Sequence, residues 1–262
     1  MSDVLFHRLR VREVVVETDD SRSLVFDLAP SQAERFRYRP GQFLTLRVPG
    51  QEGAVARCYS LSSSPEVDQH PKVTVKRVDG GYGSNWICDH VGPGSELDAL
   101  EPAGVFTPRS FEEDLLLFAG GSGITPIMSI VKSALSAGTS RIVLVYANRD
   151  ESSVIFSAEL NRLVAEHPDR LVVLHWLESV QGLPGIEALH ALVEPYDFRQ
   201  AFLCGPRPFM QAARKALRQK DFPRTGLHLE RFASLAGDPF DDARPADPEL
   251  GVDRPQQLGR AR

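Results

Sequence analysis

From residue 114 onward, short apolar runs alternate with segments of helical pattern, and this alternation limits the possible folds more than any other feature. Runs of strand character fall at residues 115–119, 142–147, 171–177, 201–204 and 227–232, and helical patterns fall at 125–136, 156–166, 185–192 and 208–218. Strands and helices that alternate at this spacing form a parallel sheet wrapped by helices. Such sheets bind ligands outside the carboxyl ends of their strands, where the strand order reverses. Residues 109–234 are therefore predicted to form an α/β domain with a binding site at that edge.

The first 108 residues have the pattern of a β domain. Short β-branched or alternating runs at 11–18, 23–28, 43–48, 54–61 and 72–78 are mostly separated by clusters of Gly, Pro or Asp. This spacing is typical of a small antiparallel barrel or sandwich. One helix is expected at residues 84–90, with Ser84 as its N-cap. A chain of 262 residues is long enough for two domains, here an antiparallel β-barrel (1–108) followed by an α/β parallel-sheet domain.

The last segment, residues 235–262, differs from both halves. From Gly237 onward it is rich in Pro, Asp and Arg and nearly free of aromatic residues. Such a segment cannot bury enough apolar area to offset the entropy lost on ordering. We therefore expect a disordered tail.

Charge and composition exclude several classes of protein. The net charge of −5 argues against nucleic-acid binding, which needs a basic face. No apolar run approaches the roughly 20 residues that span a bilayer, and the opening MSDVLFHRLR lacks the apolar core of a secretory signal. The 3 cysteines are too widely spaced for a disulfide framework or a zinc site, and the 7 histidines show no ligand spacing, so no metal is expected. A reducing, cytoplasmic location is the simplest expectation.

A cluster of glycines follows the first strand of the α/β half, in FAGGSGITPIM (118–128). Gly121 and Gly123 let the backbone approach a ligand, and the helix behind them presents free N–H groups. Thr125 can cap this helix, and Pro126 fits its first turn although it stands where a dinucleotide fingerprint has a third glycine. The stretch suits a diphosphate. Taken alone, a tight turn that binds nothing is an equally good interpretation.

The motif RCYSLSS (57–63) ends a strand of the predicted barrel. Arg57 offers a fork of donors suited to a phosphate. Tyr59 offers a flat ring that can stack on a flavin, and Ser60 offers a hydroxyl near the reactive edge of that ring. The alternative is a strand with a solvated Arg and a core Tyr.

Two further motifs complete the series. In VKRVDGGYGSNWI (75–87), the turn from Gly81 to Ser84 forms a second anion cradle at a helix start. In LCGPRPFM (203–210), Cys204, Gly205 and Pro206 lie at the tip of a strand and precede another helix.

These four motifs, in this order, resemble the ferredoxin–NADP reductase superfamily, in which an FAD-binding barrel precedes a pyridine-nucleotide domain. The resemblance extends roughly from Phe6 to Phe232. Within the superfamily, the chain is especially similar to reductases of bacterial oxygenases, of the 3-ketosteroid 9α-hydroxylase and phenylacetyl-CoA epoxidase type. The stretches that carry this similarity are RCYSLSSSP, GSNWICDH, AGGSGITPIMSIVKSAL, LVYANRDESSVIF and LHWLESVQGLP.

The resemblance implies a role for each residue of the motifs. FAD contacts are implied for Arg57, Cys58, Tyr59, Ser60, Val75, Arg77, Gly81, Gly83, Ser84 and Phe232. Contacts with NADH or NADPH are implied for Gly121, Ser122, Gly123, Thr125, Pro126, Asn148, Arg149, Asp150, Cys204, Gly205 and Pro206. Catalytic roles are implied for Ser60 beside flavin N5, Cys204 beside the nicotinamide, and Glu230 in proton traffic. Phe232 would cover the flavin until the nicotinamide displaces it.

The choice between NADH and NADPH depends on ANRDES (147–152), which follows the second strand of the α/β half. The adenosine ribose should lie there. Arg149 could pair with a 2′-phosphate, whereas Asp150 and Glu151 would repel it and could accept hydrogen bonds from the ribose hydroxyls. One basic side chain faces two acids, so NADH is favoured.

Oxygenase reductases of this type continue into a plant-type ferredoxin domain, whose [2Fe–2S] cluster needs four cysteines. The 3 cysteines of this chain lie in other segments, so no iron–sulfur cluster is expected here, and the chain is either naturally short or truncated. The favoured interpretation is a monomeric FAD-dependent NAD(P)H reductase that passes electrons to a separate iron–sulfur protein or oxygenase. A free-standing reductase of ferric chelates, flavin or quinone is the alternative. A nucleotide-sensing regulatory subunit ranks last, because its usual cysteine cluster is missing.

Overall fold

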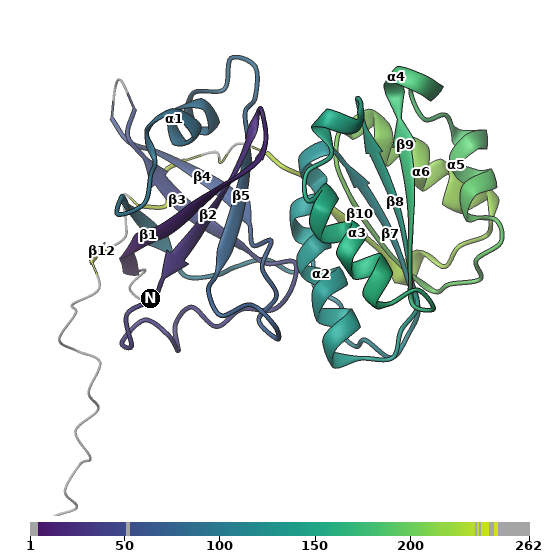
Figure 1. Ribbon diagram of the computed structural model, residues 1–262, viewed down its shortest axis with the longest axis horizontal. Helices are drawn as coiled ribbons and strands as arrows, with labels where there is room; N and C mark the ends of the chain where they lie inside the picture. Colours follow the sequence, from purple (N-terminus) through teal and green to yellow (C-terminus); the bar gives the residue numbers. More distant parts are fainter. Residues whose placement is uncertain (1–4, 51–52, 234, 236, 241–243, 246–262) are drawn as a thin grey trace, which may run out of the picture.

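A computed structural model describes residues 5–50, 53–233, 235, 237–240 and 244–245. Its two halves lie side by side, an antiparallel sheet on the left of Figure 1 and a parallel sheet wrapped by helices on the right. The predicted sequence of a β-barrel followed by an α/β domain is confirmed. Among the helices in the described ranges, none combines the length and apolar character required to cross a bilayer.

The barrel consists of six antiparallel strands in the order β4-β3-β6-β1-β2-β5. Their bounds are β1 Leu5–Thr18, β2 Ser21–Asp27, β3 Phe43–Val48, β4 Val55–Ser60, β5 Lys72–Lys76 and β6 Glu96–Leu100. An antiparallel bridge between Leu61 and Val73 joins the ends of this path and closes the barrel. Helix α1 (Tyr82–His90) contributes Ile87, which is fully buried, to the barrel core.

In this half one strand was missed and one expected helix cap was wrong. The sequence analysis missed β6, whose residues Glu96 and Asp98 interrupt the apolar pattern, although Leu97 and Ala99 between them are buried. Helix α1 begins before Ser84, with Gly81 at its N-cap position. The Ser84 hydroxyl instead accepts a hydrogen bond from the Val78 N–H at 3.1 Å, so it fixes the turn ahead of the helix.

The second half has five parallel strands in the order β11-β10-β7-β8-β9. Their bounds are β7 Leu115–Gly120, β8 Ile142–Asn148, β9 Leu171–Leu177, β10 Gln200–Cys204 and β11 Leu227–Glu230. Helices α2 (Ile124–Ala137) and α3 (Ser157–Glu166) cover one face, and α5 (Ile186–Val193) and α6 (Arg207–Gln219) cover the other. A short helix, α4 (Glu178–Gln181), follows β9 and was not predicted. The chain runs from β7 to β8 on one side and returns to β10 on the other, so the strand order reverses between β7 and β10.

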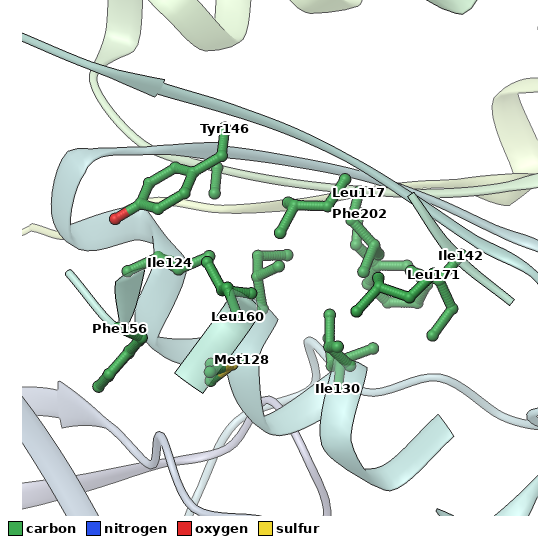
Figure 2. Packing of buried hydrophobic residues seen from close by; sticks show 14 of the residues in the cluster. Leu117, Ile124, Met128, Ile130, Ile142, Tyr146, Phe156, Leu160, Leu171 and Phe202 are labelled. Carbon is green, nitrogen blue, oxygen red and sulfur yellow. The ribbon is translucent and has the colours of Figure 1, made fainter. Parts of the chain in front are cut away.

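Alternate residues of β7 point to opposite faces of this sheet. Leu115 and Leu117 belong to the core under α2 and α3, whereas Leu116 and Phe118 belong to the core under α5 and α6. Figure 2 shows side chains of α2 and α3 packed against those of the parallel strands, among them Leu117, Tyr146 and Phe202. Because both faces are covered, the strand is apolar throughout, and this is why it could be predicted so clearly.

Helix α2 also forms the junction with the barrel, and Figure 1 shows it between the two sheets. The Ser129 hydroxyl donates to the Ser63 carbonyl, and the hydroxyls of Ser133 and Ser64 lie 2.7 Å apart. The Lys132 ammonium is 2.6 Å from a carboxylate oxygen of Asp68, on the barrel side. These contacts across the junction are polar.

Most of the tail predicted to be disordered, 235–262, lies outside the described residues. Where the tail is described, it differs from that expectation. Phe240 is 3% exposed, with its ring edge-on to Phe6 at 6.0 Å and the Arg47 guanidinium 5.6 Å from its centre. Strand β12 (Arg244–Pro245) pairs with β1. One aromatic ring thus supplies apolar burial that the composition of the tail as a whole does not suggest.

Candidate functional site

A cavity of about 560 Å³ lies where the two halves meet. The barrel contributes the end of β4, part of β5 and the start of α1, and the α/β half contributes the glycine turn after β7 and the segment after β11. Its lining consists of Arg57, Cys58, Tyr59, Ser60, Thr74, Lys76, Val78, Gly80, Gly81, Tyr82, Gly83, Ser84, Ser122, Thr125, Phe232 and Ala233. Residues predicted to contact two different nucleotides therefore border one cavity.

Arg57 enters this cavity beside the first turn of α1. A Cβ atom at Gly83 would lie 3.0 Å from the Cγ atom of Arg57, so glycine leaves room for the arginine stem. One guanidinium nitrogen donates to the Ala56 carbonyl at 2.8 Å. The strand and the helix start together hold a cation next to free helix N–H groups, an arrangement that suits an anion.

The rest of the β4 motif is partly enclosed. Ser60 is 5% exposed, and burial raises the pKa of the Tyr59 phenol, which keeps it neutral. Burial likewise raises the pKa of the Cys58 thiol. The side of the cavity formed by these residues is uncharged and contains an aromatic ring.

The start of α2 was predicted correctly as a glycine turn but not in its capping. Residues Gly121–Gly123 form a 3-10 turn that leads directly into the helix, so Gly123 rather than Thr125 occupies the N-cap position. Thr125 lies within the first turn, where its hydroxyl donates to the Ser122 carbonyl at 3.1 Å. No acidic residue occupies this first turn.

The tips of β7 and β10 pack glycine against backbone at the point where the strand order reverses. A Cβ atom at Gly123 would lie 2.1 Å from the Cys204 carbonyl oxygen. Gly205, with a φ of +154°, would bring a Cβ atom within 2.9 Å of Gly120. The predicted residues 121–126 and 204–206 are thus neighbours in space, in the crevice where open α/β sheets bind ligands.

The loop after β8 lies at the same edge of the sheet. Asn148 is buried, and neither polar atom of its amide has a hydrogen-bond partner within the described part of the chain. Asp150 caps the 3-10 turn at Glu151–Ser153, where one carboxylate oxygen accepts from the Ser153 N–H and from the Ser152 hydroxyl. The hydrogen bond from Ser152 contributes most to lowering the pKa of Asp150. Arg149 turns toward the barrel, 3.1 Å from Asp20.

A second cavity, of about 290 Å³, adjoins the first one through Cys58, Ser60, Phe232 and Ala233. Glu230 lines it at the end of β11, and burial raises the pKa of this carboxyl group. Phe232, which is 51% exposed, borders both cavities. Cys204 lines neither of them, and burial raises the pKa of its thiol.

Several lining residues were missed. Val73 and Val75 of β5 face the barrel core. Thr74 and Lys76 alternate with them and line the cavity. The alternation of residue types along β5 could have identified them. Val75 itself is fully buried, and Arg77 pairs with Asp89 of α1.

A further cavity of about 600 Å³ lies between β1, β3, β6 and Trp86 and includes none of the predicted site residues. No group of three or more His, Cys, Asp or Glu side chains in the described ranges is arranged to hold a metal ion.

The site residues fit both cofactors that the sequence analysis inferred. A volume of about 560 Å³ falls in the range usual for small-molecule sites. For FAD there are a cation at Arg57, a helix start with no acid in its first turn, and a neutral aromatic wall. For a nicotinamide dinucleotide there are the glycine turn and the unpaired amide of Asn148, whose buried polar atoms are costly to leave without partners.

Comparison with family models gives the same division of the chain. Residues 8–107 match the oxidoreductase FAD-binding domain, and residues 117–215 match the oxidoreductase NAD-binding domain. The inferred FAD and nicotinamide nucleotide cofactors are thus confirmed at the level of these families. The contacts of individual residues stay predictions.

Relatives and solved structures cover most of the chain. It is 56% identical over 240 residues to the ferredoxin reductase component of 3-ketosteroid-9-alpha-monooxygenase from Rhodococcus rhodochrous, covering 91% of this chain and 68% of that one. It is 34% identical over 242 residues to one component of the 1,2-phenylacetyl-CoA epoxidase of Escherichia coli, covering 87% and 68%. A cytochrome P450 reductase of Amycolatopsis superposes with a TM-score of 0.73 at 25% identity, covering 87% and 71%.

Proposed function

Since the chain belongs to the ferredoxin–NADP reductase superfamily, in the branch of the oxygenase reductases, we propose that it transfers electrons from NADH, through FAD, to an iron–sulfur protein or an oxygenase component. One observation carries the proposal: the barrel residues Arg57 and Tyr59 and the nucleotide-turn residues Ser122 and Thr125 line the same cavity. Two cofactors must meet for a hydride to pass between them, and this cavity is where the two sets of residues meet.

The barrel residues bind and orient the flavin. Arg57 and the N–H groups at the start of α1 would hold the diphosphate, Tyr59 would contact the ring system, and Ser60 would offer it a hydroxyl group. FAD, when bound, supplies the conversion between two-electron and one-electron transfer, which suits an iron–sulfur acceptor. The protein contributes placement and electrostatics.

The α/β half holds NADH at the crevice between β7 and β10. The backbone from Gly121 to Thr125 binds its diphosphate, and the Cys204–Pro206 tip positions the nicotinamide. The Cys204 thiol stays neutral at physiological pH, because burial raises its pKa, so the tip of β10 brings no charge to the nicotinamide position.

Glu230 and Phe232 act at the second cavity. Phe232 is half exposed and borders both cavities. From this position its ring would shield a bound flavin until the nicotinamide takes its place. Burial raises the pKa of Glu230, which favours a carboxyl group that can hold a proton near Ser60.

We place the protein in the cytoplasm as a monomer. The thiols of Cys58, Cys88 and Cys204 are all free, which suits a reducing compartment. The acceptor is then a separate protein. Equilibrium sedimentation of the FAD-loaded chain tests the monomeric state.

Steady-state assays test the function itself. The FAD-loaded protein should oxidise NADH with ferricyanide and also reduce a plant-type [2Fe–2S] ferredoxin from an oxygenase system. A preference for ferric chelates, free flavin or quinone, with no reduction of the ferredoxin, would favour the small-acceptor reductase instead. A protein that binds both nucleotides but oxidises no NADH would be a regulatory subunit.

Replacing Arg57 by Ala tests the FAD site directly. The lost charge-assisted contact is worth about 1.5–3 kcal/mol, or roughly a 10- to 150-fold weaker affinity for FAD. The matched control is Arg12→Ala, which removes an exposed arginine from the same barrel, where Arg12 pairs with Asp27. Equal FAD retention by the two variants on gel filtration would show that Arg57 does not bind the diphosphate.

A further inference from the structure

One ion pair links the nucleotide loop of the α/β half to the barrel. A terminal nitrogen of Arg149 lies 3.1 Å from the Oδ2 atom of Asp20, in the turn between β1 and β2. The two residues are 129 positions apart in the chain. Arg149 is the basic residue of the ANRDES loop, where the ribose of the nucleotide is expected.

Asp20 is the fixed member of this pair. Its Oδ1 atom accepts hydrogen bonds from the hydroxyls of Thr18 at 2.8 Å and Ser21 at 3.0 Å, and the Lys76 ammonium lies 3.4 Å from Oδ2. Its side chain is 28% exposed, against 67% for Arg149. Burial alone would raise the pKa of Asp20, but the Thr18 hydrogen bond and the Lys76 charge outweigh it and lower the pKa. The carboxylate is therefore ionised and held by the barrel, and Arg149 is the side chain free to move.

Asp150 does not explain a preference for NADH as simply as the sequence suggested. One of its carboxylate oxygens already caps the turn that follows, through the Ser153 N–H at 2.9 Å and the Ser152 hydroxyl at 2.7 Å. A substitution there would disturb the loop as well as the charge. Asp20 lies outside this loop. Among the residues of the loop, its carboxylate pairs with Arg149, and its other ionic partner, Lys76, belongs to the barrel.

We propose that Asp20, from the barrel, sets the nucleotide preference of the other half by holding Arg149, so that the chain binds NADH in preference to NADPH. This inference rests on the proposed function, which places the adenosine ribose beside Arg149. A 2′-phosphate needs a cationic partner to offset the free energy that it loses on desolvation. With Arg149 engaged by Asp20, that phosphate must either break the ion pair or lie near a second anion. The ribose of NADH carries no 2′-phosphate, so NADH can bind without breaking the ion pair and without placing two anions side by side.

The test uses the FAD-loaded protein and two adenosine fragments. Calorimetry gives the Kd values of adenosine 2′,5′-bisphosphate and of 5′-AMP for the wild type, Asp20→Asn, Arg149→Gln and the double variant. Because exposed ion pairs are weak, Asp20→Asn should tighten the bisphosphate by about two- to fivefold and leave 5′-AMP unchanged. In the Arg149→Gln background, the same substitution should give no gain.

The matched control is Asp19→Asn, which removes an equal charge from the neighbouring exposed residue. It should not alter the ratio of the two Kd values. If Asp20→Asn loses FAD, Asp20→Ser keeps an oxygen for Thr18 and allows the same comparison.

Three results would overturn the inference. They are no gain in Asp20→Asn, a gain that persists without Arg149, and an equal gain in Asp19→Asn. Wild-type protein that binds neither fragment would instead reject the nucleotide site of the proposed function.

Discussion

Replacing Lys132 by Met should loosen the junction between the barrel and the α/β half. Lys132 projects from α2 and is 4% exposed. Its ammonium lies 2.6 Å from Asp68 on the barrel side and 3.1 Å from Glu159 of α3. Methionine keeps much of the apolar stem and removes the charge. Asp68 then loses its cation, and Glu159 keeps only Lys72, whose ammonium lies 3.6 Å away.

The size of the effect follows from how enclosed those carboxylates are. Breaking a fully buried ion pair by removing one partner costs about 3–5 kcal/mol. Here the side chains of Asp68 and Glu159 are 32% and 24% exposed, so water recovers part of the loss. We expect about 2 kcal/mol, which in a chain of this size lowers the melting temperature by roughly 4–8 °C.

The assay is thermal unfolding of the FAD-loaded protein, followed by flavin fluorescence. Lys215→Met, which removes an exposed lysine from α6, is the matched control and should melt like the wild type. Adding Asp68→Asn to Lys132→Met should restore much of the loss, because Asp68 is the carboxylate left without a cation, whereas Glu159 keeps Lys72. The reasoning is refuted if Lys132→Met melts like Lys215→Met, or if the double variant is no more stable than the single one.

Two further predictions concern Glu230 and the tail. Burial raises the pKa of Glu230 above its ordinary value of 4.5, so the folded protein favours the protonated form. Ionisation of Glu230 therefore lowers the free energy of unfolding. This loss is absent below pH 4.5 and complete above the pKa of the folded protein. Glu230→Gln should therefore match the wild type in urea unfolding at pH 4 and be the more stable of the two at pH 7.5; an equal difference at both pH values would contradict this. Phe240→Ala should cost about 1–2 kcal/mol in the same assay, less than a core Phe because the ring packs at the barrel edge, whereas Leu183→Ala, at a residue 77% exposed, should cost little. Removal of residues 237–262 should cost as much as Phe240→Ala, although the sequence alone predicts no cost, and a truncated chain as stable as the full one would show that the Phe240 contact contributes nothing.

The α/β half was predictable because its central strands β7, β8 and β10 are buried on both faces. Runs such as Leu115–Gly120 are apolar at every position, as expected of a short strand covered on both faces. The barrel was harder. Strand β6 is buried on one face only. The acidic residues Glu96 and Asp98 on its other face interrupt the apolar run, so the strand was not recognised in the sequence.

The local motifs of the site were found, but the contacts that join the two halves were not. The motifs at 57–63, 81–84 and 121–126 are each contiguous, so their chemistry can be read from neighbouring residues. The pairs Lys132 with Asp68 and Arg149 with Asp20 join residues 64 and 129 positions apart. Their partners depend on which faces of the domains meet, and neither periodicity nor composition carries that information.

The two long-range pairs differ in a way that matters for catalysis. Lys132 is buried in the junction, where an unpaired charge is costly, so this pair keeps the two halves, and therefore the cavity between them, in place. Arg149 is 67% exposed, and an exposed ion pair costs about 0.2–1 kcal/mol to break. A nucleotide can therefore compete with Asp20 for Arg149 without opening the junction. We therefore expect the geometry of hydride transfer and the selection of the nucleotide to depend on separate charges. Substitutions at Lys132 should alter the rate of flavin reduction, while those at Asp20 should alter the preference for NADH.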